Sequence, residues 1–293
     1  MISQLFGAFL VESGRLTQEQ LNTVYETQKK VRVKLGIIAV SEKLMTTEQA
    51  DEVNRLQAVM DKKFGDIAVE KGYLTDEQVL RLLGLQGNPY LSFVQAVSDN
   101  EYLSLDEIEQ ALLEYKNKYG YTSTDIEALK SGEADRIVPM FIPQEVKELQ
   151  AEHLLVCVRA VLRLVDNNAY VSEGYFANTL ESDFIAMQAM EGDKKASLSL
   201  IGEGVLGMAC KFANEKFETV NLDALDAISE FINCVNGMFA TKLSSNISID
   251  IDMLPPSYKA EKVTLTGEFF VLPIYVFGKE VKIVSTFGEV VYF

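Results

Sequence analysis

The feature of this sequence that most constrains its fold is a repeat of 29 residues in its first third. Six positions are identical in three successive units, and in the first unit they are Gly7, Val11, Thr17, Glu19, Gln20 and Gln28. The Thr-x-Glu-Gln segment of each unit is typical of a helix N-terminus with a capping box, because the hydroxyl and the amide can each bind the other residue's backbone N–H. Each unit is therefore predicted to be two short helices joined at the threonine, and the units are predicted to stack on one another.

A fourth, weaker unit follows the first three. Phe93 keeps the aromatic position, and the segment Ser104 to Glu107 keeps the capping box in phase. The helical repeat domain is therefore predicted to span residues 1–120. Residues 121–143 are polar and rich in turn formers, so they are predicted to be a linker, and residues 144–293 are predicted to be a second domain.

The repeats resemble the tandem motif of the N-terminal cyclic di-GMP-binding domain of type II secretion and pilus ATPases, whose period is also 29. The segments 34–57 and 63–86 fit best, with lysine where that family prefers arginine, whereas Leu5 and Lys43 depart from the motif. A lysine before a glycine-led helix can neutralise a phosphate while the glycine lets backbone N–H groups approach it. The alternative is a helical array that contacts protein. The resemblance implies a nucleotide site at Lys34, Gly36, Gln57, Lys63, Gly65 and Gln86.

Composition and charge limit the classes of function. The sequence has 27 Lys and Arg against 43 Asp and Glu, a formal net charge of −16, and an acidic chain repels nucleic acid. The sequence contains no apolar run of about 18 residues, the length that a membrane-spanning helix needs, and it shows no signal-peptide pattern. We therefore expect a cytoplasmic protein. Cys157, Cys210 and Cys234 lie among apolar residues and are expected to be unpaired and mostly buried. With a single histidine, His153, no metal site is expected.

The second half of the sequence alternates helix-like and strand-like segments. Apolar spacing predicts a helix over 144–165 and a long helix over 222–243. Strands are predicted over 170–176, 197–201, 205–212 and 246–253, with a hairpin over 268–277 and 280–287. The predicted fold class is α+β overall: all-α helical-hairpin repeats, followed by an α/β sandwich-type domain with an antiparallel sheet and one long helix.

The long helix carries an unusual polar face. At about 100° per residue, its apolar side is predicted to hold Leu225, Ile228, Phe231, Ile232, Val235, Met238, Phe239 and Leu243. The opposite side holds Asp226, Glu230, Asn233, Gly237 and Thr241. Ordinary solvated faces are rich in Lys, Arg, Glu and Gln, whereas a glycine in a helix interior costs about 1 kcal/mol relative to alanine. Residues that weaken a helix on its exposed side favour a docking surface there.

The spacing Asp226-x3-Glu230-x2-Asn233-x22-Pro256 resembles the signature of the CheC/CheX-type chemotaxis phosphatases. Only one copy occurs, as in the CheX-like branch. The resemblance implies a CheX-like domain that dephosphorylates the phospho-aspartate of a response-regulator receiver. Asn233 would place the attacking water, and Glu230 would pair with a lysine of the receiver. The flanking docking residues would be Asp226, Gly237, Thr241 and Pro256.

The resemblance also implies the partners. The chain needs no cofactor of its own, because the receiver would hold Mg²⁺ on the phosphoryl oxygens. Expected partners are a receiver domain and cyclic di-GMP, and a homodimer is compatible with the resemblance. The alternative function is a non-catalytic adaptor that binds a receiver, cyclic di-GMP, or a component of secretion or motility.

Overall fold

The computed structural model describes residues 1–288, and the chain divides into two compact units. The first unit is Ile2–Gly132, and the second is Met1 together with Glu133–Phe293. Across residues 1–288, no helix combines the length and the apolar character that crossing a membrane requires.

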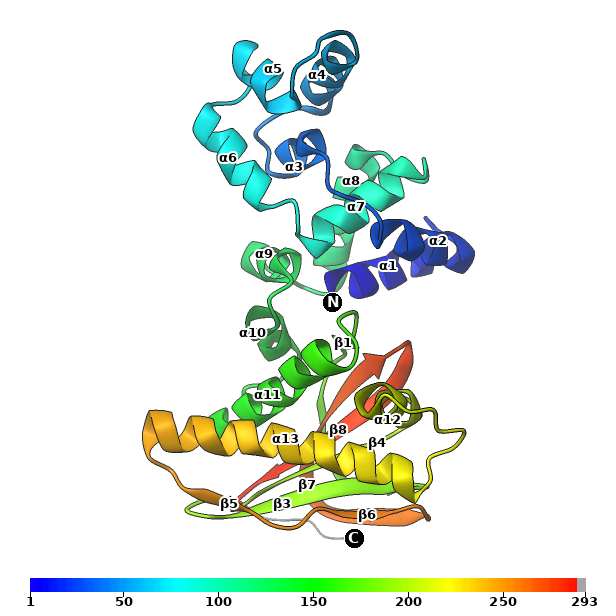
Figure 1. Ribbon diagram of the computed structural model, residues 1–293, viewed down its shortest axis with the longest axis vertical. Coiled ribbons are helices and arrows are strands. Elements are labelled where there is room, and N and C mark those ends of the chain that lie inside the picture. The colour runs from blue at the N-terminus through cyan, green and yellow to red at the C-terminus, as the bar shows by residue number, and fades with distance from the viewer. Residues whose placement is uncertain (289–293) are drawn as a thin grey trace. The chain divides into compact units, whose positions relative to one another are not determined.

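The first unit is all helical, and its helices follow the 29-residue period (Figure 1). The four predicted pairs are α1 (Ile2–Glu12) with α2 (Gln18–Gln28), α3 (Leu35–Ser41) with α4 (Thr47–Val59), α5 (Phe64–Glu70) with α6 (Asp76–Gly84), and α7 (Pro89–Asp99) with α8 (Leu105–Lys118). A further helix, α9 (Ser123–Ser131), lies in the segment that was expected to be a linker. The polar run that suggested a linker contains its capping box, formed by Thr122 and Asp125.

The capping boxes explain why the second helix of each pair begins where it does. The N-cap residues Thr17, Thr46, Thr75 and Ser104 each donate their backbone N–H, at 2.8 Å, to the side chain three residues later. Each N-cap hydroxyl accepts the backbone N–H of that same residue in return. This reciprocal bonding satisfies two backbone donors that a helix end otherwise leaves unpaired.

The repeated glycine has a packing role that the sequence interpretation did not include. A Cβ atom on Gly7 would lie 2.8 Å from the Leu21 side chain, and one on Gly65 would lie 2.8 Å from Val79. Real Cβ atoms do not come this close to neighbours. The glycine therefore allows the first helix of a pair to pack directly against the second.

The second unit is an eight-stranded antiparallel sheet with helices against one face (Figure 1). The strands run in the order β1-β7-β8-β4-β3-β5, while β2 pairs with β7 and β6 pairs with β3. Their bounds are β1 (Tyr170–Val171), β2 (Tyr175–Ser182), β3 (Ile185–Gly192), β4 (Ala196–Ile201), β5 (Ile251–Met253), β6 (Ser257–Lys259), β7 (Val263–Val276) and β8 (Lys279–Phe287). The helical segments are α10 (Ala134–Ile137), the 3-10 helix η1 (Val138–Phe141), α11 (Glu148–Leu164), α12 (Val205–Ala213) and α13 (Leu222–Ile247).

The long helix α13 packs against α11, α12 and strands β3 to β6. Its predicted apolar side is buried except for Met238, which is 45% exposed. Because side chains alternate along a strand, Gln188 of β3 points toward α13 while Met187 points to the other face of the sheet. On that other face a second apolar cluster is formed by Ile185, Met187, Ile201, Val263, Leu265, Phe269, Val271 and Val284.

One strand prediction in this unit was wrong, and two others were confirmed only in part. The segment 205–212 forms α12 rather than a strand, and Asn214 in the left-handed conformation ends that helix. The segment 170–176 is divided between β1 and β2. The segment 246–253 forms only the short β5, because α13 continues to Ile247 before Ser248 turns the chain with a positive φ. The predicted hairpin is confirmed as β7 and β8, joined by a two-residue turn at Phe277 and Gly278, both with positive φ.

Candidate functional site

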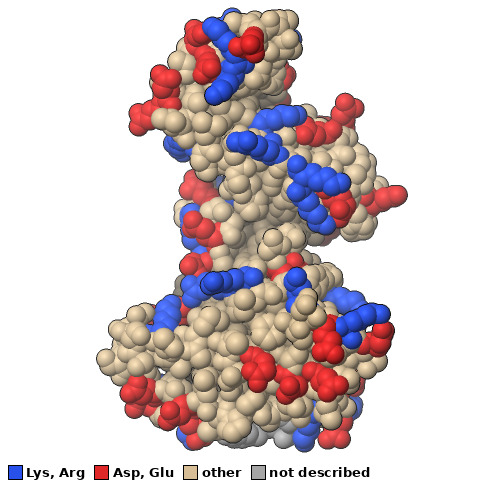
Figure 2. All heavy atoms as spheres, viewed as in Figure 1, with Lys and Arg blue, Asp and Glu red and all other residues tan. Residues whose placement is uncertain are grey.

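The uncovered side of α13 carries the polar residues singled out in the sequence. Asp226, Glu230 and Thr241 are exposed, while Asn233 and Gly237 are half-buried. They lie together because residues three or four apart share one side of a helix, and the opposite side is held against the sheet. Figure 2, in the orientation of Figure 1, shows acidic side chains over the N-terminal half of α13.

The segment that contains Pro256 lies beside this face. Pro256 is half-buried and directly precedes β6, a strand that contacts α13. The Tyr258 hydroxyl of β6 donates to the Asp226 carboxylate at 3.2 Å. The negative charge of Asp226 also raises the pKa of Tyr258. Asp226 therefore links the start of the polar face to the segment that follows Pro256, and sequence reasoning missed Tyr258.

The side-chain amide of Asn233 is hydrogen-bonded to a residue of the sheet on which α13 packs. Its Oδ1 accepts a hydrogen bond from Nε2 of Gln188 at 2.9 Å, and the same Nε2 donates to the backbone carbonyl of Leu254 at 2.8 Å. Gln188 is only 1% exposed. Sequence reasoning missed this residue, although one signal was available: a long amide side chain in the middle of the apolar run 185–190.

Gly237 and Thr241 form the C-terminal part of the polar face. The Thr241 hydroxyl donates to the backbone carbonyl of Gly237 at 2.8 Å, so it is satisfied within the helix. A Cβ atom on Gly237 would meet only the end of the Met253 side chain, at 3.8 Å. No contact within the described chain therefore requires glycine at this position.

The three cysteines are unpaired, as predicted, but their burial differs. Cys157 is fully buried, and burial raises the pKa of its thiol to about 12. Cys210 is half-buried, and Cys234 is exposed, so the expectation of burial was wrong for Cys234. The reason is position: Cys234 follows Asn233 on the uncovered side of α13, where apolar neighbours in sequence belong to the opposite side.

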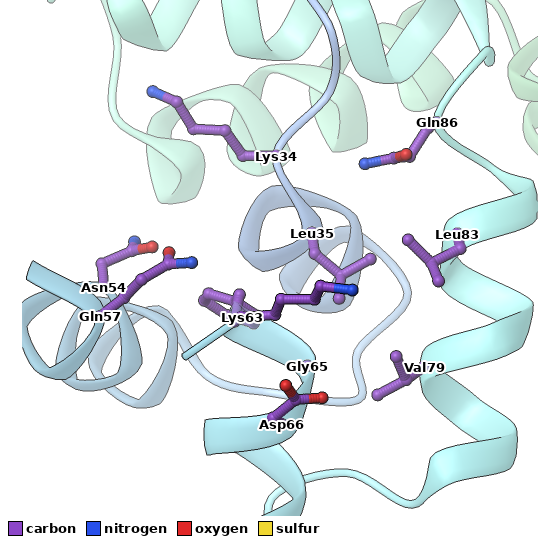
Figure 3. Close-up of a pocket in the computed structure, with 11 residues that line it drawn as sticks. Lys34, Leu35, Asn54, Gln57, Lys63, Gly65, Asp66, Val79, Leu83 and Gln86 are labelled. Carbon is purple, nitrogen blue, oxygen red and sulfur yellow. The ribbon is translucent and has the colours of Figure 1, made fainter. Parts of the chain in front are cut away.

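The first unit contains a cavity at the predicted nucleotide site (Figure 3). Its volume is about 620 Å³, within the range of small-molecule sites. Of the six predicted residues, the cavity is lined by Lys34, Gln57, Lys63, Gly65 and Gln86. Gly36 is not among the lining residues; it packs instead beside the Phe64 ring, which a Cβ atom would approach to 3.1 Å.

The cavity has a mixed electrostatic character. The Lys34 ammonium pairs with Asp99 at 2.8 Å, and Asp66 also lines the cavity. Figure 3 shows the Lys63 side chain lying across the cavity, with Gln57 of α4 to one side and Leu83 of α6 to the other. Gln86 accepts from the Arg32 guanidinium at 3.1 Å and donates to the backbone carbonyl of Val33 at 2.9 Å. Besides Lys34 and Lys63, a third cation, Arg32, therefore lies next to the lining.

Within the described residues, no group of three or more His, Cys, Asp or Glu side chains could hold a metal ion.

Comparison with known proteins gives similarity in fold over part of the chain. No family model and no curated protein matches the sequence. A CheX chemotaxis protein from Desulfovibrio desulfuricans is 15% identical, with a TM-score of 0.42, and the match covers 48% of this chain and 99% of that one. A CheC-like superfamily protein from a Shewanella species is 18% identical, with a TM-score of 0.43 and coverages of 49% and 100%. A CheX-CheY-BeF3-Mg²⁺ complex from Borrelia burgdorferi is matched at 15% identity and a TM-score of 0.39, with coverages of 47% and 96%.

Proposed function

We propose that the uncovered face of α13 docks on the receiver domain of a response regulator and promotes hydrolysis of its phospho-aspartate. The observation that supports this is the joint placement of Asp226, Glu230 and Asn233 on one accessible helix face. Their spacing, together with Pro256, is that of the phosphatase signature. Pro256 lies directly before a strand that contacts the same helix.

The chemistry demands little of the helper protein. The oxygen of a water molecule attacks phosphorus, the bond from phosphorus to the aspartyl oxygen breaks, and the carboxylate leaves with its electron pair while inorganic phosphate forms. An acyl phosphate is already activated, so placing the water in line is the main contribution that remains. The amide of Asn233 can do this without titrating. Glu230, one helical turn away, forms an ion pair with a lysine of the receiver.

The catalytic role is tested with phospho-receiver decay. Each receiver domain encoded in the same genome is phosphorylated with acetyl phosphate and followed with and without the full chain. Asn233→Ala is expected to lower the stimulated rate about 100-fold or more while receiver binding persists, because the amide acts in the transition state. Equal stimulation by the wild type and Asn233→Ala would remove the catalytic claim.

The docking role is tested with charge reversal. Glu230→Lys is expected to weaken receiver binding at least about tenfold at low salt, and less at high salt, because an interfacial ion pair is lost. Glu173→Lys is the matched control, since Glu173 is also exposed and lies between β1 and β2, strands that pair with β7 rather than lie under α13. If a receiver binds but its decay is unchanged, the chain is an adaptor.

We further infer that the cavity of the first unit binds a cyclic dinucleotide. The supporting observation is that five of the six residues that the resemblance implied, from two repeat units, line one cavity. Lys63 and Lys34 supply cations for two phosphates, while Gln57 and Gln86 supply amide donors and acceptors. Binding requires Lys34 to exchange its Asp99 partner for a phosphate.

Calorimetric titration of the full chain with cyclic di-GMP tests this inference. Lys34→Ala with Lys63→Ala is expected to abolish the heat of binding, because both phosphate contacts are lost. Lys30→Ala is the control, since Lys30 is exposed and does not line the cavity. No heat with the wild type at millimolar ligand would favour the alternative, in which the repeats contact protein.

A further inference from the structure

A chain of hydrogen bonds runs from Asn233 into the core of the second unit. Gln188 donates to Asn233, and its Oε1 accepts from Nδ2 of Asn236 at 2.9 Å. Oδ1 of Asn236 lies 2.8 Å from Nε2 of His153 on α11. Asn236 and His153 are both fully buried, and the His153 ring stacks on Phe239 at 4.4 Å between centroids. These side chains connect the amide of Asn233 on α13 to two other elements of the fold, β3 and α11.

A single backbone atom decides which group donates and which accepts in each of these hydrogen bonds. The carbonyl oxygen of Leu254 can only accept, so the end of Gln188 that faces it must be the NH2 group. The two protons of that NH2 group go to Leu254 and to Oδ1 of Asn233. The oxygen of Gln188 then faces the NH2 group of Asn236, whose own oxygen faces His153. Nε2 of His153 therefore carries the proton, and its buried Nδ1 has no partner among the described residues.

We propose that Gln188 is a positioning residue: it holds the oxygen of Asn233 inward, so that Asn233 presents its NH2 group to the receiver. This inference rests on the proposed function and specifies how Asn233 acts in it. The NH2 group donates to the oxygen of the attacking water and holds it in line with phosphorus.

Burial makes the reversed orientation costly. Turning the amide of Asn233 over would set its NH2 group against the NH2 group of Gln188, so the Gln188 proton that now goes to Asn233 would lose its acceptor inside the fold. Turning Gln188 over as well would place its oxygen against the Leu254 carbonyl. Both reversals break bonds inside a region of low dielectric, where unpaired polar groups are most expensive.

The direction of these hydrogen bonds, from Asn233 to His153, can be measured without any partner protein. His153 is the only histidine, so its ring nitrogens give unambiguous NMR signals in the full chain after selective ¹⁵N labelling. The proposal predicts the Nε2–H tautomer at neutral pH and slow solvent exchange for both side-chain NH2 protons of Gln188. The Nδ1–H tautomer, or fast exchange of those protons, would overturn the inference whatever the enzymatic result.

The consequence for hydrolysis is measured with two variants. Gln188→Met keeps length but removes all hydrogen bonding, and it is expected to lower kcat roughly 100-fold through a loosened amide. The receiver concentration for half-maximal rate should stay within about twofold, because docking contacts are untouched. Ser197→Ala is the control for weakening the sheet, since Ser197 is buried on β4 and bonds to Thr286 instead.

Asn233→Asp separates the donor from the acceptor. It keeps the inward oxygen but replaces the outward NH2 group with an oxygen, so it is expected to be as inactive as Asn233→Ala. Activity near wild type in Asn233→Asp or in folded Gln188→Met would overturn the inference and leave the proposed function standing. If the wild type stimulates no receiver, the proposed function itself fails, and the NMR result still reports on the hydrogen-bond chain.

Discussion

His153 is a buried base whose protonation opposes folding. Burial lowers the pKa of His153 from 6.5 to about 4, and the hydrogen bond to Asn236 only partly offsets this. His153 therefore becomes protonated near pH 6.5 in the unfolded chain but only near pH 4 in the folded chain. Stability from this residue is complete above pH 6.5 and is lost as the pH falls toward 4, a total of about 3 kcal/mol.

Urea unfolding at pH 7 and pH 5 measures this contribution. His153→Gln is the reference, because its amide can still donate to Asn236 but does not titrate. The wild type is expected to lose about 2 kcal/mol more than this variant between the two pH values. An equal loss in both proteins would mean that His153 is charged in the folded state.

Cys234 offers a reporter beside Asn233. It is exposed, whereas Cys157 is fully buried with a raised pKa, and Cys210 is half-buried. One thiol is therefore expected to react fast with a disulfide reagent in the native chain, and Cys234→Ser should remove that fast phase. If α13 is the docking face, a bound receiver slows the labelling of Cys234. Fast labelling of Cys157 would contradict the burial described above.

At the scale of elements, α13 is defined by what lies on its two sides. The buried side needs a full row of apolar residues, and the uncovered side tolerates residues that weaken a helix. Gly237 is the clearest case, since a methyl group there meets only Met253 at an ordinary distance. Packing within the described chain does not require glycine there, whereas a closely approaching partner would.

Gly237→Ala tests that explanation. The substitution is expected to stabilise the second unit by about 0.5–1 kcal/mol, because alanine loses less backbone entropy in a helix. It is expected to weaken receiver binding at the same time. Gly84→Ala in α6 is a comparison, since a Cβ atom there would meet no atom within 4 Å and Gly84 lies in the other unit. Stabilisation with unchanged receiver binding would assign Gly237 no docking role.

Elements with strong local signals were predictable from the sequence. The repeat helices could be placed because a capping box marks the start of the second helix in each pair. The hairpin of β7 and β8 could be placed because a glycine marks its turn. The segment 205–212 could not, because most of its residues are apolar, so its buried side at Val205, Met208 and Ala209 does not stand out, and its stop signal is an asparagine in the left-handed conformation. The local amino-acid sequence also could not show that α13 continues through Asn246 and Ile247.

The candidate site was predictable in part for the same reason. The polar face of α13 follows from helical periodicity, so Asp226 and Glu230 could be placed on it. Gln188 and Tyr258 join the site only through sheet register and long-range hydrogen bonds, which no local pattern encodes. Cys234 and Met238 were misjudged because apolar character alone does not decide which side of a helix a residue occupies.

At the scale of the whole molecule, two compact units have separate cores and separate candidate sites. The cavity lies within Ile2–Gly132, and α13 lies within the second unit. A ligand that binds the cavity is therefore expected to stabilise the first unit and to leave the second unit unchanged. At a concentration of 100 times its Kd, cyclic di-GMP would stabilise the first unit by about 2.7 kcal/mol.

In scanning calorimetry of the full chain, the ligand and Gly237→Ala can then each identify the thermal transition of one unit. Cyclic di-GMP at that concentration is expected to raise one thermal transition by on the order of 10 °C, and Gly237→Ala is expected to raise the other by a few degrees. The double substitution Lys34→Ala with Lys63→Ala should remove the response to the ligand without removing the response to Gly237→Ala. If the ligand and Gly237→Ala shift the same single transition, the units unfold as one body, and the assignment of each site to its own folding unit is wrong.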